Sequence, residues 1–196
     1  MLISIEGVEA AGKTLLSNKL CDSLNNSGVN AVVLRDPGTT KLGEYLRKYL
    51  KENETTKEER LYSILAVKAS LKREILKQER EDKIVIMDRY IDSTVVYQGL
   101  KDEFGVDKVM MLGEDIFLIP QLTFIVDVSL ETVISRMNHR KEFDMIEKDF
   151  KEAELSELLK YYRQLPKIFP SRIFYFLNGE EPIEKLIFKA REILGF

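Results

Sequence analysis

The feature that most constrains this chain is an eight-residue loop of the kind that binds nucleotide phosphates. Residues 7–14 read Gly-Val-Glu-Ala-Ala-Gly-Lys-Thr and match the pattern G-x-x-x-x-G-K-[ST]. The largely apolar residues 2–5 precede the loop, and residues 15–20 have the composition of a helix. A strand, then this loop, then a helix is the context in which the pattern holds phosphate groups. The chain is therefore predicted to bind a nucleoside triphosphate.

The chemistry of the loop follows from its backbone. Glycines let the chain turn tightly, so that successive N–H groups point toward phosphate oxygens, and the following helix adds the partial positive charge of its N-terminus. Lys13 is expected to reach the β- and γ-phosphates, and the Thr14 hydroxyl to ligate Mg²⁺. The predicted ATP-binding residues are Gly7, Val8, Glu9, Ala10, Ala11, Gly12, Lys13 and Thr14.

Short apolar segments alternate with longer charged segments along the rest of the chain. The apolar segments lie at residues 2–5, 31–34, 84–87, 122–128 and 172–177, and segments of helical period lie at 41–50, 55–81, 130–140, 145–163 and 181–194. This alternation predicts an α/β fold, a doubly wound five-stranded parallel sheet flanked by helices. No linker or repeat interrupts it, so residues 1–196 are expected to form a single domain.

The composition excludes several classes of function. One cysteine among 196 residues excludes an internal disulfide and a zinc site built from cysteines. The net charge of −3 provides no general attraction to nucleic acid or to an anionic membrane. No apolar run approaches the ~18 residues of a membrane span, and the first residues do not resemble a signal peptide. We therefore expect a cytoplasmic protein without nucleic-acid or membrane partners.

Charged residues cluster directly after the predicted strands. Asp88 follows residues 84–87, where phosphate-loop proteins carry an aspartate that orients magnesium, so Thr14 and Asp88 are expected to hold Mg²⁺, directly or through water. Arg89 is suited to bidentate recognition of a second phosphate. Ligands of doubly wound sheets bind beyond the carboxyl ends of the strands. Several arginines beside one phosphate loop therefore indicate phosphoryl transfer between two phosphate-bearing substrates.

The order of these motifs resembles that of one known family. The matching segments are Ile5-Glu6-Gly7 before the loop, Arg35-Asp36-Pro37-Gly38-Thr39, Gly43-Glu44 with Arg47, Asp88-Arg89-Tyr90 with Tyr97-Gln98-Gly99, and Asp144-Met145-Ile146-Glu147. Over residues 3 to 150 the chain resembles the thymidylate kinase family of P-loop nucleoside monophosphate kinases. The resemblance implies a kinase fold with a short lid at about residues 136–147, and a homodimer built on the helices at 41–50 and 55–81.

The resemblance also implies a reaction and roles for individual residues. It implies transfer of the γ-phosphoryl group of ATP to dTMP, with Mg²⁺ as cofactor. Glu9 matches an acidic residue near the deoxyribose 3′-hydroxyl and the magnesium, whereas Arg47 and Arg89 match residues that grip the acceptor's 5′-phosphate. Thr94 and Tyr97 match residues that line the nucleobase and the 2′ face of the sugar. The predicted catalytic residues are Lys13, Asp88, Arg89, and the lid arginines Arg136 and Arg140.

The predicted nucleobase pocket departs from the family pattern. Ile64 and Lys68 stand where the family has a phenylalanine and an arginine, and the spacing of four places both on one helix face. Isoleucine can cover a base but cannot stack on it, and an ammonium is a point charge rather than a planar fork. dTMP is the expected acceptor, with dUMP or UMP as alternatives.

Two further alternatives belong to other classes of protein. A deoxynucleoside kinase has a similar fold but needs a carboxylate base, and Glu9 is the only carboxylate in the loop. A nucleotide-binding switch module without an acceptor is the alternative that is not an enzyme. A switch module should carry the guanine-reading motif Asn-Lys-x-Asp, which the sequence lacks.

Overall fold

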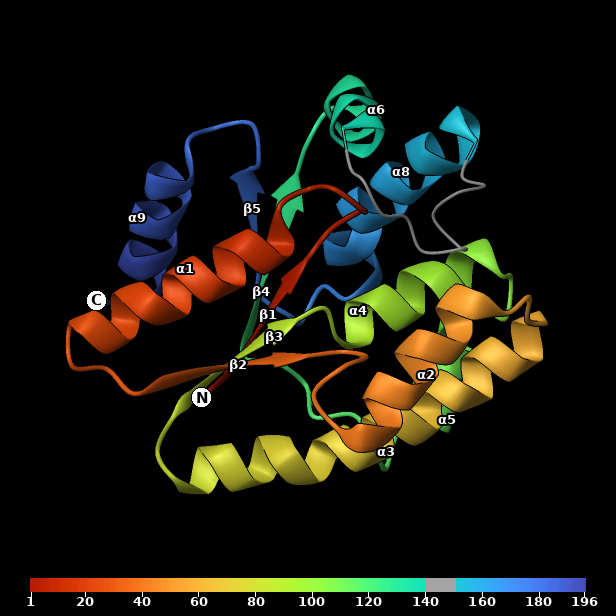
Figure 1. Cartoon of the computed structure of the whole chain (residues 1–196), viewed down its shortest axis with the longest axis horizontal. Helices are drawn as coiled ribbons and strands as arrows, with labels where there is room; N and C mark the ends of the chain where they lie inside the picture. Colours follow the sequence, from red (N-terminus) through yellow and green to blue (C-terminus); the bar gives the residue numbers. More distant parts are fainter. Residues whose placement is uncertain (140–150) are drawn as a thin grey trace.

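The computed structural model describes residues 1–139 and 151–196. Its centre is a sheet of five parallel strands in the order β2-β3-β1-β4-β5 (Figure 1). The strands are β1 (Leu2–Glu6), β2 (Ala31–Arg35), β3 (Ile84–Asp88), β4 (Leu122–Asp127) and β5 (Phe174–Asn178). The predicted fold class is therefore confirmed.

Burial in the sheet follows the position of each strand. Every residue of the inner strands β1 and β3 is buried, whereas the edge strands β2 and β5 are largely half-buried or exposed. This is the pattern of a sheet covered by helices on both faces, in which inner strands are apolar throughout. The carboxyl ends of β1, β2 and β3 lie at one edge, where the charged motifs of the sequence follow them.

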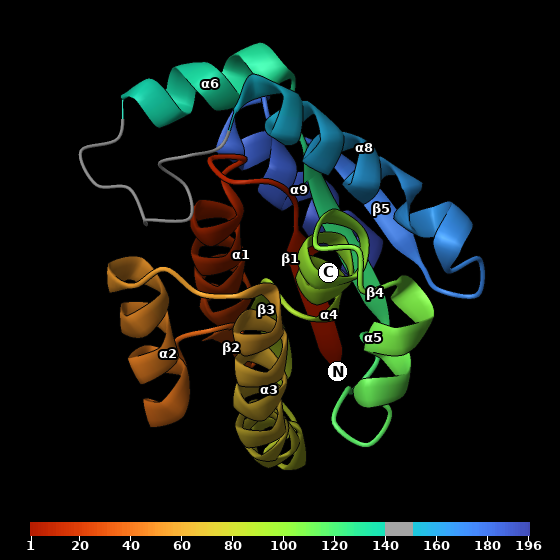
Figure 2. The ribbon, with the colours of Figure 1, turned by 90° about the vertical axis from the view of Figure 1, so that its right-hand side faces the viewer.

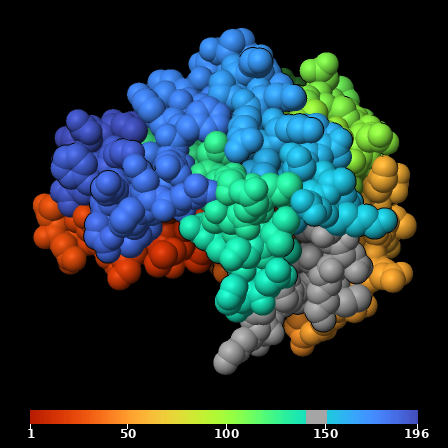
Figure 3. Space-filling model, turned by 90° about the horizontal axis from the view of Figure 1, so that it is seen from above, coloured from red at the N-terminus to blue at the C-terminus, as the bar shows by residue number. Residues whose placement is uncertain are grey.

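Helices connect the strands, as the alternation of segments predicts. They are α1 (Lys13–Asn26), α2 (Lys41–Glu52), α3 (Lys57–Arg80), α4 (Ile91–Thr94), the π-helical segment η1 (Val95–Lys101), α5 (Val106–Leu112), α6 (Leu130–Asn138), α8 (Glu152–Ile168) and α9 (Ile183–Leu194). α1 packs on α9, and α2 lies beside α3 (Figures 1 and 2). Seen from above, α6, α8 and α9 form much of the surface (Figure 3).

Local signals fix where two of the longer helices begin. The Thr56 hydroxyl accepts a hydrogen bond from Glu59 N while the Glu59 carboxylate accepts one from Thr56 N, a capping box that starts α3. The Ser129 hydroxyl caps α6 by accepting a hydrogen bond from Thr132 N at 3.2 Å. Both helices then bury an apolar stripe.

Some boundaries and elements differ from the sequence-based prediction. The helix predicted at 145–163 extends to Ile168 despite Pro166, because a proline this close to the helix end breaks few hydrogen bonds. Its predicted beginning lies outside the described residues. Short helices between β3 and β4, namely α4, η1 and α5, were not predicted.

Among the described residues, no helix is both long and apolar enough to span a membrane.

Candidate active site

A cavity of about 730 Å³ opens beyond the carboxyl ends of β1, β2 and β3. At one side, which we call the phosphate end, it is lined by Glu9, Lys13, Thr14, Asp88 and Arg89. At the other side, the base end, it is lined by Asp36, Ile64, Lys68 and Thr94. The cavity therefore collects residues from the phosphate loop, from the end of β3 and from α3 and α4. All seven predicted acceptor-binding residues line it: Glu9, Arg47, Ile64, Lys68, Arg89, Thr94 and Tyr97.

The phosphate loop joins β1 to α1, in the predicted context. Gly7 has a φ of +141°, and a Cβ on it would lie only 2.6 Å from the carbonyl oxygen of Val126 on β4. Only glycine therefore lets the loop leave the sheet at this point. α1 begins at Lys13, so its N-terminal amide groups face the loop. The loop residues Val8, Ala10 and Ala11 are buried, which holds the backbone in a fixed shape.

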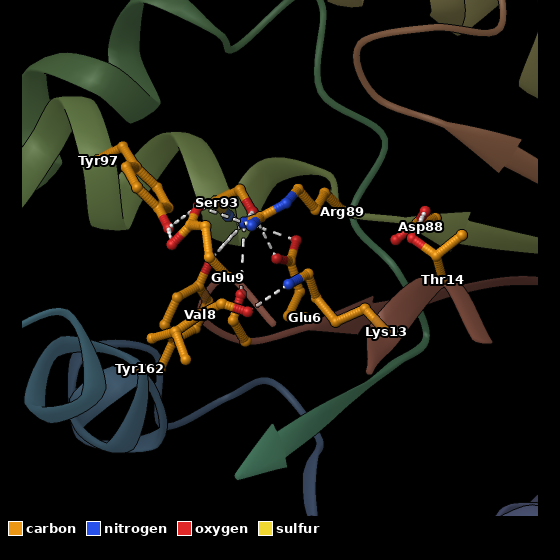
Figure 4. Close-up of polar contacts among 11 residues, drawn as sticks. Glu6, Val8, Glu9, Lys13, Thr14, Asp88, Arg89, Ser93, Tyr97 and Tyr162 are labelled. Atoms are coloured by element: carbon orange, nitrogen blue, oxygen red, sulfur yellow. Dashed lines mark hydrogen bonds and ion pairs between the residues drawn. The ribbon is translucent and has the colours of Figure 1, made fainter. Parts of the chain in front are cut away.

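Lys13 is buried beneath the loop, and its ammonium donates to the carbonyl oxygen of Val8 (Figure 4). Burial, together with the nearby guanidinium of Arg89, lowers the pKa of Lys13 to about 7, although Glu9, Asp88 and Glu6 favour the charged form. The protein surroundings thus leave this ammonium poorly stabilised. An anion in the loop would supply the stabilisation that the protein does not.

The two predicted magnesium ligands lie in direct contact. The hydroxyl of Thr14 donates to Asp88 Oδ2 at 2.6 Å (Figure 4). Hydroxyl and carboxylate oxygens are the ligand type that Mg²⁺ prefers, and Mg²⁺ usually completes its shell with water and substrate phosphates. Among the described residues, no group of three or more His, Cys, Asp or Glu side chains is arranged so that it could hold a metal ion.

Arg89 is the most connected side chain of the phosphate end (Figure 4). Its Nη2 donates to Glu9 Oε1 at 2.8 Å, and its Nη1 lies 3.3 Å from the carbonyl oxygen of Gly7. Nη1 also donates to the hydroxyls of Ser93 at 3.2 Å and Tyr162 at 3.3 Å. These contacts come from the phosphate loop, from α4 and from α8. They fix the plane of the guanidinium.

Glu9 is held by two neighbours. The Tyr97 hydroxyl lies 2.6 Å from both of its carboxylate oxygens, and Arg89 forms the ion pair. Burial alone would raise the pKa of Glu9, but Arg89, Lys13 and Tyr97 together lower it below the ordinary value. Glu9 is therefore an ionised carboxylate, with its oxygens engaged by a cation and a phenol.

Glu6 lies behind this cluster and is a residue whose role the sequence does not reveal. It is wholly buried, and its Oε1 accepts hydrogen bonds from the backbone N–H groups of Tyr90 at 2.6 Å and Ser93 at 3.3 Å. Its Oε2 accepts from the Ser93 hydroxyl at 2.7 Å. Burial, together with the charge of Asp92, raises the pKa of Glu6 to about 7. Glu6 thus organises the turn that carries Arg89.

At the base end, Lys68 is closed on its own protein partners. The side chain forms an ion pair with Asp36 and donates to the carbonyl oxygen of Tyr90 at 3.1 Å. Lys68 is 1% exposed, and its Nζ lies 5.2 Å from the centre of the Tyr90 ring. Burial raises the pKa of the Asp36 carboxyl, whereas Lys68 lowers it. Ile64, one turn earlier, packs on a small cluster of Leu46, Leu50 and Val67.

Comparison with known sequences decides which family this is. The sequence model of the family described as thymidylate kinase matches residues 5–187. This chain belongs to the thymidylate kinase family. A thymidylate kinase of Thermoanaerobacter sp. (strain X514) is 34% identical over 189 residues, which cover 94% of this chain and 92% of that protein.

Two other relatives match to a similar extent. A thymidylate kinase of Rickettsia rickettsii (strain Sheila Smith) is 34% identical over 177 residues, covering 87% of this chain and 85% of that protein. One of Fervidobacterium nodosum is 32% identical over 189 residues, covering 95% and 94%. The family resemblance inferred from the motifs is therefore confirmed over nearly the whole chain.

The structure describes one of the two predicted lid arginines of this member of the thymidylate kinase family. Arg136 on α6 contacts the phosphate loop, because its Nη1 donates to the carbonyl oxygens of Ala11 at 3.1 Å and Ala10 at 3.3 Å. Its Nη2 donates to the carbonyl oxygen of Gly179 at 2.8 Å. Arg140 and the predicted lid from residue 140 onward lie outside the described residues.

Proposed function

We infer that this member of the thymidylate kinase family transfers the γ-phosphoryl group of ATP to dTMP, giving ADP and dTDP. The family match supports the reaction. The observation that carries it in the structure is the single cavity shared by the phosphate loop and the two acceptor arginines, Arg47 and Arg89. This arrangement would let two phosphate groups meet within one cavity, as phosphoryl transfer requires.

The residues of the phosphate end supply charge and position rather than covalent chemistry. We propose that Lys13 binds the β- and γ-phosphates of ATP and that Arg89 and Arg47 bind the 5′-phosphate of dTMP. In-line transfer spreads negative charge over the moving group, which these cations stabilise. The attacking oxygen already belongs to an anionic phosphate, so the reaction needs no general base. Because Glu9 is engaged by Arg89 and Tyr97, the geometry does not favour a deoxynucleoside kinase, which would need a free carboxylate.

Mg²⁺ is the cofactor that we propose for the phosphate end. Thr14 and Asp88, whose oxygens are in contact, would hold it directly or through water. When bound, the ion would supply positive charge to the phosphates of ATP. Asp88 Oδ2 also lies 3.6 Å from Nε of Arg35, with which it forms an ion pair.

Tyr97 and Glu9 are proposed to select a deoxyribose acceptor. The Tyr97 ring stands beside Glu9 in the cavity and is fixed there by its hydroxyl, which contacts both carboxylate oxygens. In this proposal the fixed ring occupies the space that a ribose 2′-hydroxyl would need, and Glu9 accepts a hydrogen bond from the 3′-hydroxyl. Steric exclusion of this kind rejects the competing substrate without a new attractive contact.

At the base end we propose that Ile64 covers the nucleobase and that Thr94 lines it. Lys68 is retained as a base-contacting residue in this proposal, with its charge balanced by Asp36. We propose that Arg136 shapes the phosphate loop through its bonds to Ala10 and Ala11, and that Arg140 contributes charge from the lid.

A homodimer built on α2 and α3 is proposed as the assembly. Leu42, Tyr45 and Tyr49 lie on one face of α2 and are all exposed, Tyr45 to 69%. The rings of Tyr45 and Tyr49 stack at 6.5 Å. Exposed aromatic side chains in such a row favour association. Light scattering should therefore give about twice the mass of one chain, and Tyr45→Glu should shift the protein toward a monomer.

The function is tested by measuring ADP release with a panel of acceptors. We expect dTMP to stimulate ATP turnover most, dUMP and UMP less, and thymidine not at all. Equal turnover with and without every monophosphate would overturn the proposal. A preference for thymidine over dTMP would favour a deoxynucleoside kinase.

A further inference from the structure

Tyr162 is a buried tyrosine of α8 whose hydroxyl reaches the phosphate end of the cavity (Figure 4). It is 2% exposed, so the ring is part of the core while the hydroxyl is directed at polar groups. That hydroxyl lies 3.3 Å from Arg89 Nη1 and 3.0 Å from the Ser93 Oγ. No motif of the family resemblance drawn from the sequence includes this residue.

The hydrogen bonds around Tyr162 have a defined direction. The Ser93 hydroxyl donates to Glu6 Oε2, so its oxygen is left to accept. The Tyr162 hydroxyl therefore donates to Ser93, and its own oxygen accepts from Arg89 Nη1. The result is a chain of donors that begins at Arg89, passes through Tyr162 and Ser93, and ends at Glu6. A fully satisfied buried network of this kind holds its members in one geometry.

Arg89 needs this support because the protein must fix a long side chain that begins in an unusual backbone conformation. Its φ is +66°, a region that residues with a Cβ rarely adopt. Glu9 holds one side of the guanidinium through Nη2. The hydroxyls of Ser93 and Tyr162, together with the carbonyl of Gly7, hold the other side through Nη1. Without them the guanidinium could rotate about its contact with Glu9.

We propose that Tyr162 is a positioning residue for phosphoryl transfer, whose hydroxyl orients Arg89 toward the 5′-phosphate of the acceptor nucleotide. The inference rests on the proposed function, because it assigns Arg89 to that phosphate. Tyr162 acts through Arg89 and does not itself bind substrate. Its effect therefore depends on whether the ligand carries a 5′-phosphate.

The test compares two tyrosines that are neighbours on the same helix. Tyr162→Phe keeps the ring in the core and removes only the hydroxyl. Tyr161→Phe is the matched control, because the hydroxyl of Tyr161 bonds Glu157 rather than the site. For each variant the KM values for dTMP and ATP are measured, together with the inhibition constant of thymidine, which competes for the same cavity without a phosphate.

Tyr162→Phe should raise the KM for dTMP about tenfold, as expected for the loss of a hydrogen bond to a charged group. The thymidine inhibition constant and the KM for ATP should stay within about twofold, and Tyr161→Phe should change none of the three. An equal loss of dTMP and thymidine affinity would show a merely structural role, and an unchanged KM for dTMP would exclude any role. Either result overturns the proposal.

A second variant keeps the test decisive if Tyr162→Phe does not fold. Ser93→Ala removes the other hydroxyl that contacts Arg89 Nη1 and the group to which Tyr162 donates. It should also weaken dTMP more than thymidine, and an equal effect on both would count against the proposal. Failure of the proposed function is recognised separately, because the unmodified protein would then release no ADP with dTMP.

Discussion

The two ends of the cavity use buried charge in opposite ways. At the phosphate end, the described hydrogen bond of the Lys13 ammonium goes to a backbone carbonyl, and burial lowers its pKa to about 7. At the base end, the equally buried ammonium of Lys68 forms an ion pair with Asp36. Burial alone therefore does not show which of two cations is left to bind an anion. A cation that its own protein leaves poorly stabilised is suited to bind an anion, whereas a paired cation stabilises the fold.

Removal of the Lys13 ammonium tests the phosphate end of the cavity and should have the greatest effect on activity. Lys13→Met should lower kcat about 10³-fold, because one cation close to the transferring phosphoryl group is lost. The variant should fold normally, since it removes a charge that burial disfavours. Steady-state ADP release and a thermal melt measure the two quantities. A kcat within tenfold of the unmodified protein would mean that Lys13 does not contact the moving group.

The opposite outcome is expected for the lysine of the base end. Lys68→Met should lower the free energy of unfolding by about 3 kcal/mol, since it leaves Asp36 buried without its partner. Adding Asp36→Leu should restore much of the loss. Lys77→Met, on an exposed position of the same helix, is the control and should cost less than about 0.5 kcal/mol. Urea unfolding checks all three; equal stability of Lys68→Met and the control would refute the contrast between the two ends.

Arg89→Lys tests whether the phosphate end binds the acceptor and ATP through different residues. An ammonium keeps the charge but cannot contact Glu9 and a phosphate with one planar fork. The KM for dTMP should rise about 30-fold, while the KM for ATP should change less than threefold. If the KM values for dTMP and ATP rose together, Arg89 would contribute to the binding of both substrates rather than of the acceptor alone.

Substitutions of Tyr97 test recognition of the sugar, which the variants at the phosphate end and the base end of the cavity do not address. Tyr97→Ala should reduce the preference for dTMP over its ribonucleotide counterpart about tenfold, because the ring that excludes the 2′-hydroxyl is gone. Tyr97→Phe keeps the ring and should keep the preference. The ratio of kcat/KM values for the two nucleotides is the measurement, and an unaltered ratio in Tyr97→Ala would place the sugar elsewhere.

The smallest effect concerns pH. With a pKa of about 7, Lys13 is largely protonated below pH 7 and loses its proton above it when no ligand is bound. Phosphate binding favours the charged form, so ATP binding should take up a proton above pH 7, and ATP affinity should fall about fivefold between pH 7 and pH 8. Titration calorimetry in buffers of different ionisation enthalpy detects the uptake. Lys13→Met should abolish it, and uptake that persists in the variant would assign the proton to another group.

Those features that depend on neighbours in sequence could be predicted. The phosphate loop is a continuous segment, and the start of α6 at Ser129 and Thr132 is a local hydrogen bond. The parallel sheet followed from the alternation of apolar and helical segments. The short helices between β3 and β4 were missed, because their sequence from 91 to 112 lacks a long helical repeat.

The parts that could not be predicted depend on residues far apart in the chain. The pairing of Lys68 with Asp36 joins positions 32 residues apart, and the contact of Arg89 with Tyr162 joins positions 73 apart. The neighbouring tyrosines Tyr161 and Tyr162 look alike in the sequence, because periodicity shows which helix face is buried but not which residues lie opposite it. Glu6 was visible only as part of a motif. Its hydrogen bond with Ser93 forms only because the sheet places β1 beside β3.

The left-handed backbone of Arg89 carries a conformational cost at a position that the proposed function requires. A residue with a Cβ gives up roughly 1–2 kcal/mol in this conformation, whereas asparagine tolerates it better and glycine adopts it freely. Replacing Arg89 by glycine would remove this cost but would also leave the buried Glu9 carboxylate without its ion pair. The strained conformation therefore persists because the contacts of the guanidinium outweigh it.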